Sequence, residues 1–184
     1  ERVFLTGADP LAVGYERMLR ILKLIKKYFP YCGCVAAYAS VRSLKRYSVG
    51  ELAALHREGL RLLYVGFETG NDEVLAFMKK GNTAEEAIQQ GRKLTEANMI
   101  FNAIIMYGIA GKDKCVENAK RTAKMLNQLK PRKIITMNLT VFQGTELASL
   151  VKEGKFAEAG VKEKIREIKS LIENLDVEKR VEFD

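Results

Sequence analysis

Two residues that could do chemistry, Glu68 and Lys80, stand on either side of a short predicted helix. Residues 62–67 are apolar or aromatic apart from one glycine, which predicts a strand buried on both faces of a parallel sheet. Glu68 comes directly after that strand, and we expect the helix to begin at an Asn71 cap and to end at Gly81. A carboxylate at the carboxyl end of a buried strand can accept hydrogen bonds from a ligand or act as a general base, and a nearby lysine can bind an anion.

The ends of the other predicted strands also carry glycines or polar side chains. These ends are Gly7-Ala8-Asp9-Pro10, Ser40 to Arg42, Gly108-Ile109-Ala110-Gly111 and Gln143 to Thr145. Glycine lets backbone groups approach a ligand closely, although a strand-to-helix turn also needs glycine for its own geometry. Taken singly, each residue is explained by local structure. Because parallel strands end at one rim, the convergence of several such turns favours a binding site there.

Strand and helix alternate along the chain, with strands beginning near residues 3, 35, 63, 101 and 134. Such repetition implies right-handed crossovers and a parallel sheet, which we assign to a single domain of residues 1–184. We favour an α/β fold of the partial (β/α) barrel type, TIM-like, because the helices are expected on one side of a curving sheet. Periodicity alone leaves a flavodoxin-like open sheet as the alternative.

The composition describes an ordinary globular protein with a surplus of positive charge. The chain has 31 Lys+Arg against 23 Asp+Glu, a net charge of +8, which favours anionic partners but more often marks a solvated, lysine-rich surface. No apolar run reaches the ~18 residues that span a bilayer. Three cysteines form no even disulfide framework, so we expect a cytoplasmic protein. No metal-binding or phosphate-binding motif is present, and the single histidine lies in a predicted helix.

The sequence around Glu68 resembles a stretch of the radical S-adenosylmethionine (radical SAM) superfamily. The similar residues are Val65-Gly66-Phe67-Glu68-Thr69-Gly70-Asn71-Asp72-Glu73-Val74-Leu75 and Met78-Lys79-Lys80-Gly81-Asn82-Thr83. Three flanking segments also resemble family motifs, namely Phe4 to Pro10, Tyr107 to Gly111, and Gly144-Thr145 with Leu147. The branch with the most similar motifs includes the coproporphyrinogen dehydrogenases, methylthiotransferases and elongator-type proteins.

The resemblance implies a partial (β/α)6 barrel of which this chain supplies strands two to six. It also implies roles for residues at the rim in binding the methionyl part of S-adenosylmethionine. The backbone of Gly7, Ala8 and Asp9 would hold the amino group of the cofactor. Ser40 and Arg42 would lie near its carboxylate.

The same resemblance implies contacts to the nucleoside part of the cofactor. Glu68 would hydrogen-bond the ribose, and Lys80 would reach the ribose or the carboxylate. The backbone of Gly108 and Ile109 would pack against the adenine. Ala110 stands where the family often has proline, which weakens the match in this last segment.

The resemblance further implies a [4Fe–4S] cluster and reductive cleavage of S-adenosylmethionine to a 5′-deoxyadenosyl radical in the intact parent. Such clusters are held by a Cys-x-x-x-Cys-x-x-Cys loop, and Cys32, Cys34 and Cys115 do not have that spacing. We therefore expect the cluster ligands to lie outside this sequence and the chain alone to be inactive. Loss of the first strand would leave an exposed barrel edge, at which we expect a homo-oligomer to form.

Two other functions stay open at this point. A non-catalytic (β/α) module could bind RNA through its basic surface, with a salt-dependent affinity. An unrelated barrel enzyme could use Glu68 as a general base and Lys80 as its electrostatic partner. The sequence does not indicate the substrate.

Overall fold

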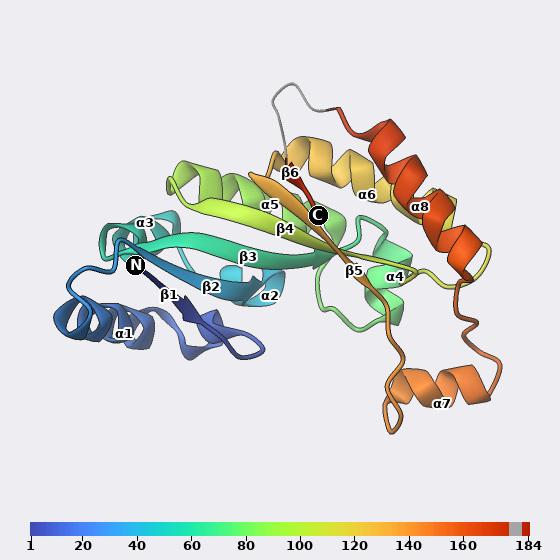
Figure 1. Cartoon of the computed structure of the whole chain (residues 1–184), viewed down its shortest axis with the longest axis horizontal. Helices are drawn as coiled ribbons and strands as arrows, with labels where there is room; N and C mark the ends of the chain where they lie inside the picture. The colour runs from blue at the N-terminus through green and yellow to red at the C-terminus, as the bar shows by residue number, and fades with distance from the viewer. Residues whose placement is uncertain (177–181) are drawn as a thin grey trace.

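The computed structural model describes residues 1–176 and 182–184, and its centre is one parallel β-sheet (Figure 1). Six strands follow one another across the sheet in chain order, each parallel to its neighbours. They are β1 (Arg2–Leu5), β2 (Cys34–Ser40), β3 (Leu60–Glu68), β4 (Ile100–Tyr107), β5 (Lys133–Asn138) and β6 (Glu182–Phe183). Because β1 and β6 do not pair with each other, the sheet is an open, partial barrel, and the predicted fold class is confirmed.

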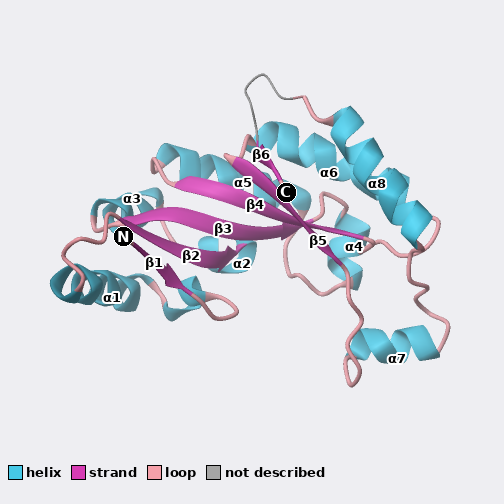
Figure 2. Cartoon of the chain, in the orientation of Figure 1, coloured by secondary structure: helices cyan, strands magenta, loops and turns pink. Residues whose placement is uncertain are grey.

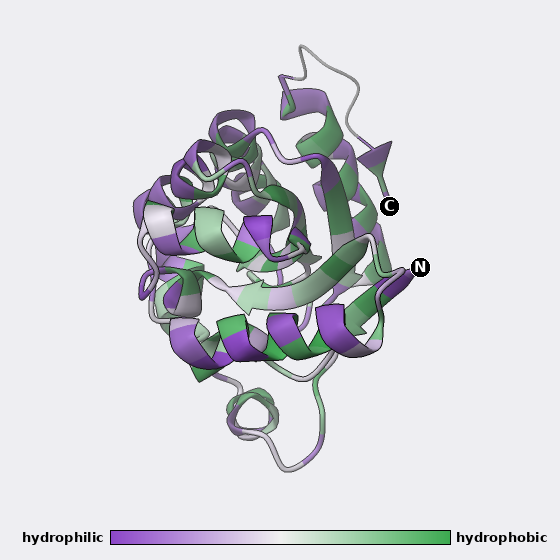
Figure 3. Cartoon of the chain, turned by 90° about the vertical axis from the view of Figure 1, so that its left-hand side faces the viewer, coloured by the Kyte–Doolittle hydropathy of each residue, from purple (hydrophilic) through white to green (hydrophobic). Residues whose placement is uncertain are grey.

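Helices connect the strands and cover one face of the sheet (Figure 2). They are η1 (Pro10–Val13), α1 (Tyr15–Tyr28), α2 (Val41–Leu44), α3 (Val49–Arg57), α4 (Asp72–Phe77), α5 (Ala84–Glu96), α6 (Cys115–Leu129), α7 (Glu146–Lys152) and α8 (Val161–Asn174). Hydrophilic and hydrophobic residues alternate around the helices (Figure 3), as expected for helices that pack on one side only. Helix α7 buries none of its residues and stands apart from the sheet (Figure 1). Among the described residues, the helices are too short or too polar to cross a membrane.

The two faces of the sheet carry different side chains because residues alternate along each strand. Leu63 and Val65 of β3 are fully buried beneath the helices, whereas Tyr64 between them points to the helix-free face. On that face Tyr64 meets Phe4 of β1 and Tyr38 of β2, with ring centroids 5.0–5.9 Å apart. The inside of the partial barrel is therefore lined by an aromatic layer near its β1 side.

Helix α4 ends two residues earlier than expected. The predicted cap was Gly81, but Lys79 takes the left-handed conformation, with φ 54°. The backbone N–H groups of Lys79 and Lys80 then donate to Ala76 and Leu75 at 3.0 Å each, which is the Schellman pattern of helix ends. The glycine preference of this position misled the prediction, since here a lysine occupies it. The two-residue strand β6 was also not predicted, because a strand this short leaves no periodic pattern.

We expect Lys79→Gly to stabilise the chain by up to about 1 kcal/mol, because glycine avoids the ~1–2 kcal/mol cost of a left-handed L-residue. The exposed ion pair of Lys79 with Glu146 offsets this gain by only ~0.5 kcal/mol. Urea denaturation measures the change. The control is Lys23→Gly within helix α1, which should destabilise by about 1 kcal/mol. Equal destabilisation by both substitutions would contradict the assigned backbone conformation.

Candidate functional site

Glu68 ends strand β3 in an unusual backbone conformation. Its φ is 65°, in the left-handed region that few residues other than glycine adopt. The register with β4 shifts between Gly66 and Glu68, so the strand has an irregularity at this point. A Cβ atom added to Gly66 would lie 3.2 Å from Glu68 Oε1, which shows that the carboxylate folds back over the glycine. The side chain of Glu68 is thereby held against the helix-free face, above Tyr64.

Lys80 meets Glu68 at this rim. Lys80 Nζ donates to Glu68 Oε1 at 3.1 Å, and the two side chains are 34% and 18% exposed. The Schellman turn after α4 fixes the backbone from which Lys80 reaches back. Glu68 Oε2 accepts no hydrogen bond from the part of the chain that the structure describes. The structure thus brings the two predicted residues together and leaves one carboxylate oxygen available to a ligand.

Asp9 and Ser40, two of the residues predicted to bind the cofactor, are bonded to each other. Ser40 Oγ and Ser43 Oγ each donate to Asp9 Oδ2 at 2.6 Å. Ser40 also caps helix α2 by accepting from the Ser43 N–H at 3.0 Å. Ser43 was missed in the sequence, although its three-residue spacing from Ser40 is a capping signal. The Asp9 carboxylate therefore joins the end of β1 to the end of β2.

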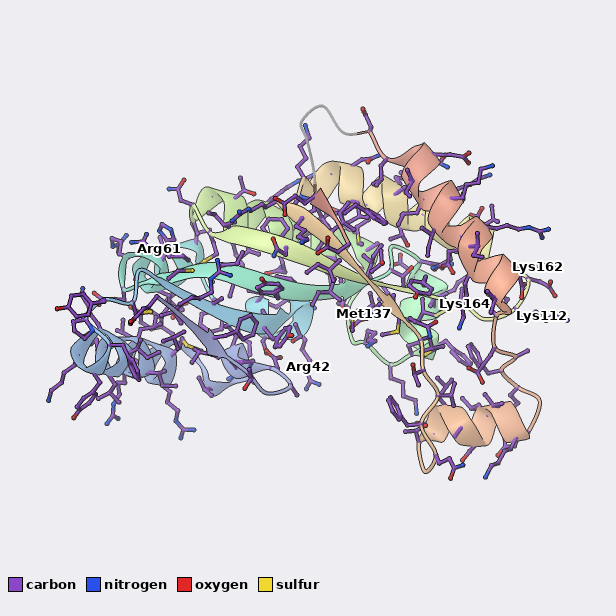
Figure 4. The ribbon with its side chains drawn as sticks, viewed as in Figure 1. Arg42, Arg61, Lys112, Met137, Lys162 and Lys164 are labelled. Atoms are coloured by element: carbon purple, nitrogen blue, oxygen red, sulfur yellow. The ribbon has the colours of Figure 1, made fainter. Side chains whose placement is uncertain are left out.

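The backbone N–H groups of Gly7 and Ala8 and the side chain of Arg42 have fewer partners within the described chain than the Asp9 carboxylate has. Gly7 has φ 107° and is exposed together with Ala8, and no described residue hydrogen-bonds their backbone N–H groups. Arg42 is an exposed residue of α2 and makes no ion pair with a described carboxylate. Figure 4 shows Arg42 at the end of the sheet toward which the strands run. These groups stay open to an anionic or zwitterionic ligand.

The turn after β4 is less open than expected. The Gly108 N–H donates to Glu167 Oε2 of helix α8 at 2.7 Å, and Ile109 is only 1% exposed. A Cβ atom on Gly108 would lie 2.8 Å from Lys164 Cε, so the lysine stem covers this glycine. The structure therefore does not bring the Gly108 N–H or the Ile109 side chain to a ligand at the rim.

Glu167 is the main polar residue that the sequence reading missed. It is 3% exposed, and burial raises its pKa above the usual 4.5. Glu167 Oε1 accepts from Asn118 Nδ2 at 2.8 Å, and Asn118 Oδ1 accepts from Thr69 Oγ1 at 2.6 Å. Thr69 directly follows Glu68. This chain of hydrogen bonds links helix α8, helix α6 and the turns after both β3 and β4.

Gly70 shows how closely the turn after Glu68 packs on helix α6. A Cβ atom at Gly70 would lie 2.4 Å from the Arg121 backbone oxygen, which leaves no room for a side chain. The Gly70 N–H donates to Thr122 Oγ1 at 3.1 Å. The glycine is thus required for close approach, and Glu68 is positioned by a turn clamped to a helix.

A comparison of the sequence with protein-family models identifies the family of this chain. The model described as the radical SAM superfamily matches residues 1–126. The chain belongs to the radical SAM superfamily. No curated protein matches its sequence.

Solved structures of radical SAM proteins share the fold. Elp3 of Methanocaldococcus infernus, with an N-terminal deletion, has a TM-score of 0.77 and 18% identity over 100% of this chain and 46% of its own. The coproporphyrinogen III oxidase HemN of Escherichia coli has a TM-score of 0.74 and 17% identity over 94% and 39%. The methyltransferase TsrM of Kitasatospora setae, with cobalamin and a [4Fe–4S] cluster bound, has a TM-score of 0.64 and 14% identity over 83% and 30%.

These likenesses establish the radical SAM fold and not a shared activity, because all three identities are low. The chain spans less than half the length of each of these proteins. Membership of the superfamily implies S-adenosylmethionine and a [4Fe–4S] cluster as the family's cofactors. The individual roles of the rim residues stay predictions.

The buried Glu167 makes a pH dependence testable. Because its pKa is raised on folding, the native state binds the proton more readily than the unfolded chain does. Its contribution to stability is therefore greatest below pH about 4.5 and falls as pH rises through the raised pKa. We expect the free energy of unfolding of wild type relative to Glu167→Gln to decrease over this window, as measured by urea titrations from about pH 4 to about pH 8.

Glu163 provides the matched control for this measurement. The backbone N–H groups of Asp113 and Gly160 lower its pKa, so its contribution is present above about pH 4.5 and is lost as pH falls. With the titrations extended down to about pH 2.5, the stability difference for Glu163→Gln should rise with pH below about pH 4.5, whereas that for Glu167→Gln should fall as pH rises above it. Equal slopes would refute the buried-carboxylate assignment.

Proposed function

We propose that this chain is the S-adenosylmethionine-binding core of a radical SAM enzyme that reductively cleaves the cofactor. The observation that best supports this proposal is the Glu68–Lys80 pair at the rim, in which Glu68 Oε2 has no hydrogen-bond partner among the described residues. A carboxylate that is positioned and only half satisfied suits the vicinal hydroxyls of a ribose, since each hydroxyl can donate to it. Lys80 neutralises the carboxylate from one side and leaves protons for a second acceptor.

Groups that could bind the methionyl part of the cofactor lie at the ends of β1 and β2. Gly7 and Ala8 offer exposed backbone groups, and Arg42 offers a guanidinium suited to a carboxylate. Ser40 donates its hydroxyl to Asp9, so we propose that it positions this loop instead of contacting the ligand through Oγ. These residues fit S-adenosylmethionine in type and in their common position at the carboxyl ends of β1 and β2.

The described residues do not provide a set of ligands for the iron–sulfur cluster. They contain no group of three His, Cys, Asp or Glu side chains arranged to hold a metal ion. Cys32 and Cys34 flank the start of β2, while Cys115 begins α6, where burial raises its pKa to about 12 and keeps the thiol protonated. The proposal for this chain is therefore limited to S-adenosylmethionine, with cluster ligands supplied by polypeptide outside these residues.

The substrate would react inside the partial barrel. We place the protein itself in the cytoplasm. Tyr38 and Tyr64 lie in one register row, two residues below Ser40 and Gly66, which places the rings ~7 Å beneath the rim. In the same row, Asn102 of β4 is 4% exposed and its Oδ1 has no described partner. An aromatic layer with two phenol hydroxyls and one amide beneath the cofactor would suit an organic substrate that carries polar groups, and its rings would help to keep water from a radical.

Glu68→Gln tests the ribose assignment in the protein that carries this chain. Losing a charged acceptor should weaken binding of S-adenosylmethionine at least tenfold, because hydrogen bonds to charged groups contribute ~1.5–3 kcal/mol. Isothermal titration calorimetry measures the change. Glu73→Gln on the neighbouring helix α4 is the control, since Glu73 is 82% exposed and should have no effect. Unchanged affinity in both variants would overturn the proposed role.

A second candidate function is RNA binding, and helix α1 is the feature that favours it. Its exposed basic residues are Arg17, Arg20, Lys23, Lys26 and Lys27. Tyr28 and Tyr31 beside them are 66% and 83% exposed, so rings for base stacking stand next to cations for phosphates. Lys23→Glu with Lys27→Glu should then reduce binding of a mixed-sequence single-stranded oligoribonucleotide and flatten its salt dependence by about two units of slope. No oligonucleotide binding by wild type in 50 mM salt would exclude this function.

A further inference from the structure

Helix α2 exposes Arg42 and buries the three other residues that form it. Val41, Ser43 and Leu44 are 1%, 4% and 0% exposed, whereas Arg42 faces solvent. A helix of four residues closes too few hydrogen bonds of its own to be stable, so contacts from other elements must fix it. The position of the Arg42 guanidinium at the rim therefore depends on how firmly these contacts hold α2.

One set of contacts fastens α2 to the segment after β1. The Asp9 carboxylate accepts hydrogen bonds from the hydroxyls of Ser40 and Ser43, at the start of the helix. Beyond the end of the helix, Tyr47 Oη donates to the Leu11 carbonyl of η1 at 2.6 Å. These bonds tie α2 to the turn after β1 and to η1. They do not satisfy the carbonyl groups at the end of α2.

Lys93 of helix α5 supplies the contact at that end. Lys93 Nζ donates to the Leu44 carbonyl at 2.7 Å and to the Tyr47 carbonyl at 2.6 Å. Leu44 is the last residue of α2, so the ammonium lies at a helix end where positive charge is favourable. Burial lowers the pKa of Lys93, because its charge is partly withdrawn from water. A second contact from α5 to this segment is the ion pair of Glu86 with Lys45.

We propose that Lys93 is a positioning residue for Arg42, and through Arg42 for the carboxylate of S-adenosylmethionine. The inference rests on the proposed function, in which the Arg42 guanidinium meets that carboxylate. Helix α5 packs on the covered face of the sheet, so Lys93 acts on the rim through α2 and does not contact the ligand. A guanidinium that is already in place loses less freedom when the ligand binds, and this preorganisation favours affinity.

Lys93→Met tests the proposal in the protein that carries this chain. Methionine has an unbranched side chain of similar length but no ammonium, so the Leu44 and Tyr47 carbonyls lose a donor and α2 is held less firmly. We expect the dissociation constant of S-adenosylmethionine, measured by isothermal titration calorimetry, to rise about fivefold. Lys93→Arg keeps donors for both carbonyls and should restore most of the affinity.

Asn127→Ala is the matched control, which separates positioning from a general loss of stability. The Asn127 side chain also bonds two backbone groups, donating to the Asn174 carbonyl at 3.0 Å and accepting from the Asp176 N–H at 2.8 Å. These contacts lie at the end of α8, which is far from α2 (Figure 1). The control should lower the melting temperature to a similar extent as Lys93→Met and leave the dissociation constant unchanged. An equal rise of the dissociation constant in both variants would overturn the proposal.

A double-mutant cycle with Arg42→Ala shows whether Lys93 acts through Arg42. Arg42→Ala alone should raise the dissociation constant about tenfold, because a charge-assisted pair with the carboxylate is lost. Adding Lys93→Met to Arg42→Ala should raise it no further, since the residue that Lys93 positions is then absent.

The cycle also separates the failure of this inference from that of the proposed function. Additive effects of the two substitutions, or a loss of affinity in Arg42→Ala with none in Lys93→Met, would overturn the role of Lys93 and leave the proposed function standing. Unchanged affinity in Arg42→Ala would overturn the proposed contact of Arg42 with the carboxylate, and the role of Lys93 with it.

Discussion

A carboxylate inside the protein sets the constraint on which the rim depends. Burying Glu167 would cost several kcal/mol if it had no hydrogen-bond donors. Its two oxygens accept hydrogen bonds from the Gly108 N–H at 2.7 Å and from the Asn118 side-chain amide at 2.8 Å. Asn118 Oδ1 in turn accepts a hydrogen bond from the Thr69 hydroxyl. Because each donor is needed, the turn after β4, helix α6 and the turn after β3 must keep their relative positions for the charge to stay satisfied.

The conformation of Glu68 depends on this arrangement. A left-handed backbone at a non-glycine residue costs of order 1–3 kcal/mol and persists only where its surroundings enforce it. Here Thr69 and Gly70 are bonded to Asn118 and Thr122 of α6, so the chain after Glu68 cannot relax. The result is a carboxylate turned back over Gly66, within reach of Lys80. The strain is located at the residue to which the proposed function gives the ribose contact.

Local sequence patterns predicted what local interactions determine. The strand–helix period predicted the parallel sheet, and the expectation of helices on one side favoured the partial barrel. The strand end and the short helix after it predicted that Glu68 and Lys80 share one rim. The facing of α8 could not be found in this way, because Val161, Ile165 and Ile172 have helical spacing and yet are all more than half exposed. Glu167 was likewise hidden among the many charges of that helix, since only tertiary contacts distinguish a buried carboxylate from an exposed one.

The turn after β4 illustrates a second limit of sequence reading. Its glycines correctly indicated close approach, but the group that approaches Gly108 is a helix of the same chain. A glycine in the sequence can indicate that another group approaches the backbone closely, but it does not indicate which group this is. Asp9 is a different case, because the expected ligand contact uses its backbone, while its carboxylate accepts hydrogen bonds from Ser40 and Ser43. Distinguishing the two uses requires knowing which other elements reach the rim.

Helix α8 is held in one orientation by its contacts with the turn after β4. Glu167 and the stem of Lys164 contact the Gly108 turn, whereas Ile165 and Ile172 are mostly exposed. A helix of 14 residues moves as a unit, so a rotation that buried Ile165 and Ile172 against the sheet would withdraw Glu167 from Gly108. Such a rotation would leave a buried N–H group and an amide without partners, each costing ~1–3 kcal/mol. The requirement to satisfy the Gly108 turn therefore explains why α8 keeps Ile165 and Ile172 exposed while Glu167 is buried.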